Sequence, residues 1–213
     1  MRLRELLAAN PALAQTRIVE THPGCAGERS LLHVATDWPG HFPNVAHTVR
    51  ILVEFGANVN ARFVGTHQEV PLHWAASSDD VDALDALLDA GADIDATGSV
   101  IDGGSPLSDA VAFGQWNAAH RLVERGARLD LWHAAALGKL ETVKQLCEGA
   151  THQQVTQAFW CACHGGQIET AQYLLSRGAD LHWVGYDRMT PLAAAVRAGA
   201  AELAAWLRSK GAN

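Results

Sequence analysis

The segment from Pro71 to Ala92 has the sequence PLHWAASSDDVDALDALLDAGA, and its pattern decides the fold. An alanine-rich stretch, HWAA, is followed by a run with leucines at positions 84, 87 and 88, the spacing of one face of a helix. Gly91 follows this run, and glycine is favoured just past the last turn of a helix. The segment therefore predicts two consecutive helices, the second of which ends at a Gly-Ala pair.

The same pattern recurs along the chain. A Gly-Ala pair closes a leucine-rich run at Gly56, Gly91, Gly126, Gly149, Gly178 and Gly211, at intervals of 35, 35, 23, 29 and 33 residues. An alanine-rich stretch precedes each run: HVAT, HWAA, DAVA, HAAA, WCAC and AAAV. Small residues in the first helix let neighbouring helix pairs approach closely and share one core. The chain is thus predicted to be a stack of about six helix pairs.

The motifs PLHWAA (Pro71–Ala76) and TPLAAA (Thr190–Ala195), together with FGANVNA, AGADIDA and RGADLH, resemble ankyrin repeats. The resemblance covers residues 30–213 and implies an all-α ankyrin-repeat solenoid with hairpin loops and a concave face that binds a partner, usually a protein. Residues 1–29 are expected to form an N-terminal capping helix and loop. His33 and His73 occupy the TPLH-like position, where the resemblance implies a hydrogen-bonded framework role.

Composition excludes several classes of function. The chain has 213 residues and a formal net charge of −7, which argues against a nucleic-acid partner because such proteins cluster cations. No apolar run approaches the roughly 20 residues of a membrane span, and the first 20 residues lack a signal-peptide core. Four cysteines are too few for a disulfide framework, so a cytoplasmic location is expected. Motifs for nucleophilic serine, nucleotide, cofactor or metal chemistry are lacking.

The loops depart from the ankyrin pattern. The turn Asp37–His47 is about five residues longer than the repeat predicts, and the links 60–71 and 95–106 are each about two residues longer. By contrast, residues 129–133 leave no space for a hairpin. The longer loops beside the missing hairpin would form the entrance to a ligand site. The alternative is that the loop lengths vary without any functional role.

Aligning the first helices by their alanine pairs places one residue of each on the concave side: Val34, Trp74, Asp109, His133, Trp160 and Ala194. Side chains three and four positions further on share that side. Two interpretations of the central residues stay open. Trp74 and Trp160 fill core volume around an inert Asp109–His133 contact, or they line a pocket in which Asp109 and His133 are a catalytic acid–base pair.

The predicted function is a binding module for a protein or small organic ligand, with an enzyme or small-molecule binder as the alternative. Seven tryptophans and eleven histidines are an unusual inventory, and many of them fall on the expected acidic, aromatic groove or its loops. The candidate binding residues are Asp37, Trp38, His41, His67, Trp74, Ser77, Phe113, Trp160, Cys163, His164, Trp183 and Tyr186. No metal ligand and no cofactor is predicted.

Overall fold

A computed structural model of the chain describes residues 2–21 and 26–213. Cys25, one of the four cysteines, lies outside these residues. The contacts divide the chain into two compact units, Met1–Ala127 and Arg128–Asn213. The single solenoid domain over residues 30–213 stays a prediction. The division lies just before residues 129–133, where the sequence leaves no space for a hairpin.

The first unit contains helix pairs and three short strands. Its elements are α1 (Arg2–Ala9), η1 (Pro11–Gln15), β1 (Arg17–Glu20), β2 (Gly27–Ser30), α2 (Leu31–Ala35), α3 (Val45–Glu54), β3 (Val64–Gly65), α4 (Pro71–Ser77), α5 (Val81–Asp89), α6 (Pro106–Ala112) and α7 (Trp116–Glu124).

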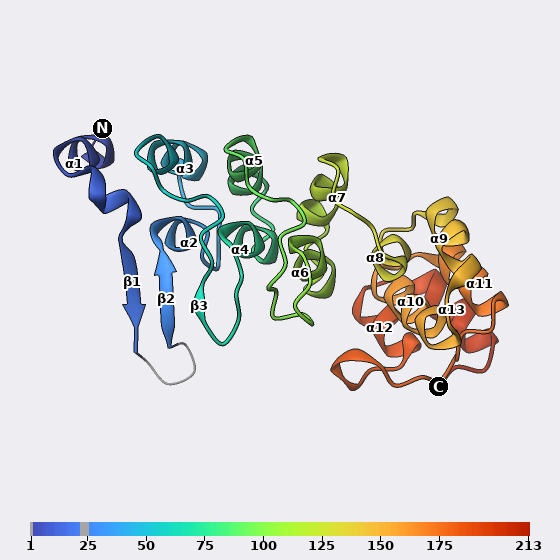
Figure 1. Ribbon diagram of the computed structural model, residues 1–213. Helices are drawn as coiled ribbons and strands as arrows, with labels where there is room; N and C mark the ends of the chain where they lie inside the picture. Colours follow the sequence, from blue (N-terminus) through green and yellow to red (C-terminus); the bar gives the residue numbers. More distant parts are fainter. Residues whose placement is uncertain (1, 22–25) are drawn as a thin grey trace. The chain divides into compact units, whose positions relative to one another are not determined.

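Two layers of helices build this unit (Figure 1). Helices α2, α4 and α6 pack in sequence in one layer, and α3, α5 and α7 pack in the other, with α1 beside α3. The core between the layers is formed by leucines that have no exposed surface: Leu32, Leu72, Leu84, Leu87, Leu107 and Leu122. The predicted helix pairs are therefore confirmed, and their apolar faces meet as the periodicity requires.

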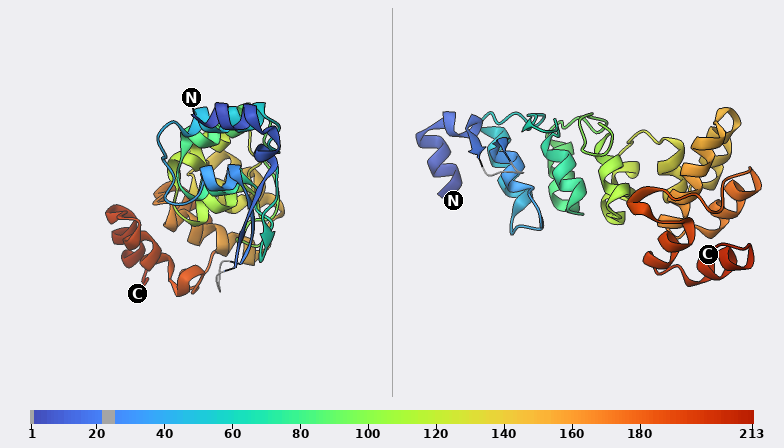
Figure 2. Two further views of the ribbon diagram at one scale, coloured as in Figure 1. Left: turned by 90° about the vertical axis from the view of Figure 1, so that its left-hand side faces the viewer. Right: turned by 90° about the horizontal axis from the view of Figure 1, so that it is seen from below.

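The strands add a small antiparallel sheet to the start of the unit, in the order β1-β2-β3. Arg17 pairs with Ser30, Glu20 with Gly27, and Glu28 with Val64. Figure 2 shows these strands beside the helices from two further directions. Residues 1–29, expected as a helix and a loop, thus contain a helix, a 3₁₀ turn and strands that join the next hairpin.

The second unit contains α8 (Leu131–Ala136), α9 (Leu140–Leu146), η2 (Cys147–Gly149), α10 (His152–His164), α11 (Ile168–Ser176), η3 (Tyr186–Arg188), α12 (Pro191–Arg197) and α13 (Ala201–Ser209). Helix α10 packs between α8 and α12, and each of these three packs against the helix that follows it. A Cβ on Gly165 would lie 1.9 Å from the carbonyl oxygen of Ala136, so this glycine lets α10 approach α8 closely.

Two features of the second unit differ from the repeat pattern. Only Ala150 and Thr151 separate η2 from α10, so no hairpin precedes this helix. Helix α10 has 13 residues, whereas α4, α6 and α12 have seven each. The additional residues extend its N-terminal end, where α4, α6 and α12 are preceded by longer links. Within the described residues, every helix is too short or too polar to cross a membrane.

Candidate functional site

Two buried histidines link successive repeats of the first unit. The Nδ1 atoms of His33 and His73 accept hydrogen bonds from the backbone N–H groups of Ser30 (3.2 Å) and Val70 (3.1 Å). Nδ1 is therefore unprotonated and Nε2 carries the hydrogen in the neutral ring. It donates to a backbone carbonyl of the next hairpin, that of Glu69 (3.1 Å) and Gly104 (3.3 Å) respectively. Burial lowers the pKa of both imidazoles to about 4.

Trp160 makes the corresponding contact in the second unit. Its indole Nε1–H donates to the carbonyl oxygen of Met189 at 2.8 Å. Met189 directly precedes the N-cap residue Thr190, just as Glu69 and Gly104 directly precede the N-cap residues of α4 and α6. Trp160 is 3% exposed, so its indole is a framework group. Of the two roles that the sequence left open for Trp160, filling core volume or lining a pocket, these contacts favour the first.

His133 has the position of a framework histidine. Its Nδ1 accepts the backbone N–H of Asp130 at 3.1 Å, three residues earlier, as in His33 and His73. Helix α8 contains three consecutive alanines, Ala134–Ala136, and alignment by the first pair placed His133 on the groove, whereas alignment by the framework histidines makes Ala134 the equivalent of Trp74. The imidazole is 2% exposed.

Asp109 is a fully buried carboxyl group of the first unit. One oxygen accepts a hydrogen bond from the Ser99 hydroxyl, and the other, Oδ2, has no hydrogen-bond partner among the described residues. Burial raises the pKa of Asp109 to about 8, and the nearby carboxylate of Glu69 adds to the rise. Asp109 and His133 belong to different units, so their pairing stays a prediction.

Glu69 collects polar contacts beside Asp109. Its carboxylate accepts hydrogen bonds from the Trp74 indole (2.9 Å) and from the backbone N–H of Val100 (2.9 Å), and it lies 3.3 Å from Nδ1 of His67. The His67 ring stacks on Phe63, with ring centroids 4.3 Å apart. These contacts tie the elongated links 60–71 and 95–106 to α4. His67 and Trp74 are therefore half-buried parts of the hairpin packing rather than free groove residues.

Exposed aromatic side chains mark a different surface of the first unit. Trp38 is 78% exposed, Phe113 49% and Phe42 42%. Trp38 and Phe42 lie on the long turn after α2, and Phe113 caps the C-terminus of α6. We call these three residues, with Val34 and Ser77, the turn surface. Trp38, Ser77 and Phe113 are among the binding residues predicted from the sequence, whereas no repeat pattern indicates the exposure of Phe42.

Hydrogen bonds and an ion pair hold this long turn in place. Asp37 pairs with Arg29 at 2.8 Å, and the backbone N–H of His41 donates to Oδ2 of Asp80 at 2.6 Å. Gly40 packs against the next turn, where a Cβ would lie 2.7 Å from that of Ser78, and its φ of +74° also favours glycine. The turn is thus docked on the following repeat, and the His41 side chain is exposed.

Most of the remaining predicted residues gather around Trp160. Its ring lies 5.5 Å from that of His164 and 5.2 Å from that of Tyr186, which is 5.9 Å from Trp183. Cys163 is the exception, because it has no exposed surface and burial raises the pKa of its thiol. It lies in the core and not on the groove side of α10.

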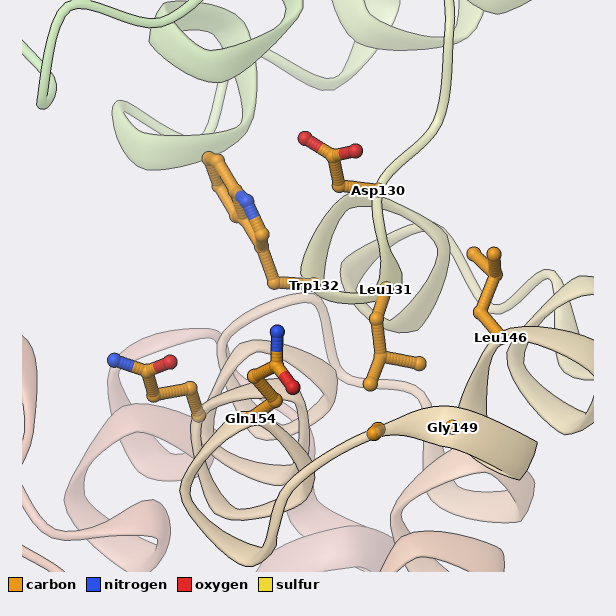
Figure 3. Close-up of a pocket in the computed structure, with 8 residues that line it drawn as sticks. Asp130, Leu131, Trp132, Leu146, Gly149 and Gln154 are labelled. Carbon is orange, nitrogen blue, oxygen red and sulfur yellow. The ribbon is translucent and has the colours of Figure 1, made fainter.

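The second unit also contains a pocket of about 500 Å³ (Figure 3). It lies among the start of α8, the end of α9 with η2, and the first turns of α10. No residue predicted from the sequence as a binding residue lines this pocket. The signal for the pocket was the pair of missing hairpins, at residues 129–133 and before α10.

Comparison with known proteins agrees with this architecture. A family model described as ankyrin repeats (3 copies) matches residues 4–98 and 131–213, and one described as ankyrin repeats (many copies) matches residues 72–129.

Two similar proteins are the ankyrin repeat and KH domain-containing proteins mask-1 of Caenorhabditis elegans and CBG24701 of Caenorhabditis briggsae. Each is 28% identical to this chain, over 78% and 82% of its length, but the matched regions are only 6% and 7% of those relatives. Together the matches to the family models span nearly the whole sequence, and the chain belongs to the ankyrin-repeat family.

Proposed function

We propose that this chain binds a partner protein through the turn surface of its first unit, formed by Val34, Trp38, Phe42, Ser77 and Phe113. Ankyrin repeats are generally protein-interaction modules, and this is the starting point of the proposal. The observation that carries it is the exposure of Trp38 and Phe113 at equivalent ends of α2 and α6.

The spacing of these aromatic residues suits a protein ligand. Neighbouring packed helices stand about 8–10 Å apart, so anchors on α2 and α6, two helices apart, are separated by roughly 20 Å. A partner must be a helix or an extended segment of several residues to contact both. Ser77, a small residue, lies between them at the end of α4.

Aromatic side chains on a rigid support are typical of binding hot spots. Tryptophan is enriched among the residues that dominate interface energies, and an exposed indole gains a large area on burial. The Asp37–Arg29 ion pair and the His41–Asp80 hydrogen bond fix the loop that presents Trp38. Binding therefore does not have to order this loop, which lowers its entropic cost.

Charge adds a preference for basic partners. The chain carries a formal net charge of −7, which attracts a positively charged segment and speeds its association. We therefore propose a partner segment with apolar anchors and basic flanks.

Selection from a displayed library of protein fragments tests this function. We expect clones selected on the full chain to lose at least about tenfold in affinity against Trp38→Ala and Phe113→Ala, because each substitution removes an exposed anchor. Leu6→Ala is the matched control, since Leu6 is a 52% exposed apolar residue of α1. Clones that bind the two aromatic variants as tightly as the wild type would contradict the proposal.

The enzymatic alternative receives no comparable support. The Asp109 carboxyl group is bound to Ser99, and His133 accepts the backbone N–H of its own N-cap residue, as the framework histidines do. These contacts favour structural roles, and we propose no second function.

A further inference from the structure

The pocket of the second unit occupies the place where two hairpins are missing. No hairpin precedes α8 or α10, and the extended start of α10 brings Gln154 and Gln157 to face the first residues of α8. In Figure 3 Leu131 points toward α10 and Gln154 toward α8, while Trp132 and Asp130 extend from the start of α8 away from α10, and Leu146 lies to one side. All five residues line the pocket. Sequence and fold together therefore produce a lined cavity of about 500 Å³, the size of a small-ligand or side-chain pocket.

Trp132 occupies a position at which other repeats have a buried leucine. The residues before His33 and His73 are Leu32 and Leu72, and both have no exposed surface. The equivalent residue in α8 is Trp132, which is partly exposed and lines the pocket. A tryptophan here presents a flat aromatic face that a leucine at this position would not provide.

The polar side chains that line the pocket favour a positively charged ligand. Asp130 is the ionisable residue among the described residues that line the pocket, and its carboxylate is 61% exposed. The side-chain amides of Gln154 and Gln157 offer carbonyl oxygens as further acceptors. Leu131 and Leu146 provide apolar surface beside these groups.

We propose that this pocket binds an arginine side chain within an extended segment of a partner protein. The planar guanidinium stacks on an indole face and donates paired hydrogen bonds to a carboxylate, which matches Trp132 and Asp130. Gln154 and Gln157 accept its remaining hydrogen bonds. Lysine lacks the planar fork of donors, and the chain's negative net charge favours a cationic segment. The leucines contact apolar residues that flank the arginine.

Nuclear magnetic resonance of the full-length, ¹⁵N-labelled chain tests this inference. The indole N–H signal of Trp132 is assigned from its loss in Trp132→Leu, which restores the residue found in other repeats. The probe is a blocked heptapeptide, Gly-Ser-Leu-Arg-Leu-Ser-Gly. We expect a saturable shift of the Trp132 signal on titration, and versions with lysine or citrulline in place of arginine to bind at least about tenfold more weakly.

Asp130→Asn is the decisive variant. Asparagine is as good an N-cap residue as aspartate, so α8 keeps its N-cap while the pocket loses its charge. We expect at least about tenfold weaker binding of the arginine peptide. Glu202→Gln removes an exposed charge from α13 and should bind as the wild type does. Unchanged binding by Asp130→Asn, equal binding of the citrulline or lysine peptide, or no saturable shift would overturn the inference.

A further arm distinguishes a protein segment from a free amino acid derivative. Arginine methylamide lacks the flanking leucines and should bind at least about tenfold more weakly than the peptide; equal affinity would overturn the assignment to a protein segment. Trp38→Ala and Phe113→Ala should leave the peptide titration unchanged. The pocket and the turn surface are thus tested independently.

Discussion

The carboxyl group of Asp109 holds a proton at neutral pH because water cannot reach it. Its pKa is raised to about 8 in the folded chain by burial, and the ordinary value is 3.8. Between these values the folded chain binds more protons than the unfolded chain, so this group lowers the free energy of unfolding as the pH rises from about 4 to about 8. Each pKa unit corresponds to about 1.4 kcal/mol.

Asp109→Asn should therefore stabilise the protein increasingly as the pH rises. Urea unfolding at pH 5, 7 and 9 measures the difference in unfolding free energy between variant and wild type. We expect it to grow by a few kcal/mol between pH 5 and about 8 and then to level off. Asp102→Asn, at an exposed position in the link 95–106 that carries Ser99, should give a difference independent of pH. A difference for Asp109→Asn that does not change across this range would show that the carboxyl group is ionised in the fold.

Trp160 contributes a hydrogen bond that a phenyl ring cannot replace. Trp160→Phe keeps an aromatic side chain but leaves the Met189 carbonyl without its indole donor. We expect a loss of about 1–3 kcal/mol in the free energy of unfolding, measured by urea denaturation. Trp206→Phe, on the outer helix α13, should cost less. Equal costs for the two variants would show that the Trp160 hydrogen bond has no net value.

At the scale of elements, Asp80 joins a helix start to the long turn before it. Its Oδ1 accepts the backbone N–H of Ala83 at 3.0 Å as the N-cap of α5, and its Oδ2 accepts the N–H of His41. Asp80→Ala should cost about 0.5–2 kcal/mol for the lost cap and speed hydrogen exchange at His41. Asp82→Ala, in the first turn of the same helix, should change stability by less than about 0.5 kcal/mol. Protection at His41 that survives Asp80→Ala would disprove this coupling.

The helix pairs could be predicted from the sequence because small residues, leucine spacing and Gly-Ala pairs are local signals. The site assignments depended on register, and three consecutive alanines at positions 134–136 leave the alignment of α8 open by one residue. His133 accepts the backbone N–H three residues earlier, as His33 and His73 do, and in the second unit the Trp160 indole donates to the carbonyl before the next N-cap residue. No local pattern distinguishes a framework indole from an exposed one. The exposure of Phe42 and the pocket beside Trp132 required three-dimensional packing.

At the scale of the whole molecule, the abundant tryptophans and histidines serve more than one purpose. His33, His73 and Trp160 connect successive repeats, while Trp38 and Trp132 remain accessible in the first and second unit respectively. Each unit thus combines a framework that uses imidazole or indole donors with an accessible aromatic side chain. The negative net charge suits basic segments at both places.

Hydrogen–deuterium exchange of the full chain, alone and with a segment selected on it, measures most directly whether the turn surface binds the partner. The account predicts slower exchange in residues 31–44 and 106–115 of the complex, and loss of this protection with Trp38→Ala. Protection confined to the outer helices α3, α5 and α7, with residues 31–44 and 106–115 unchanged, would contradict it.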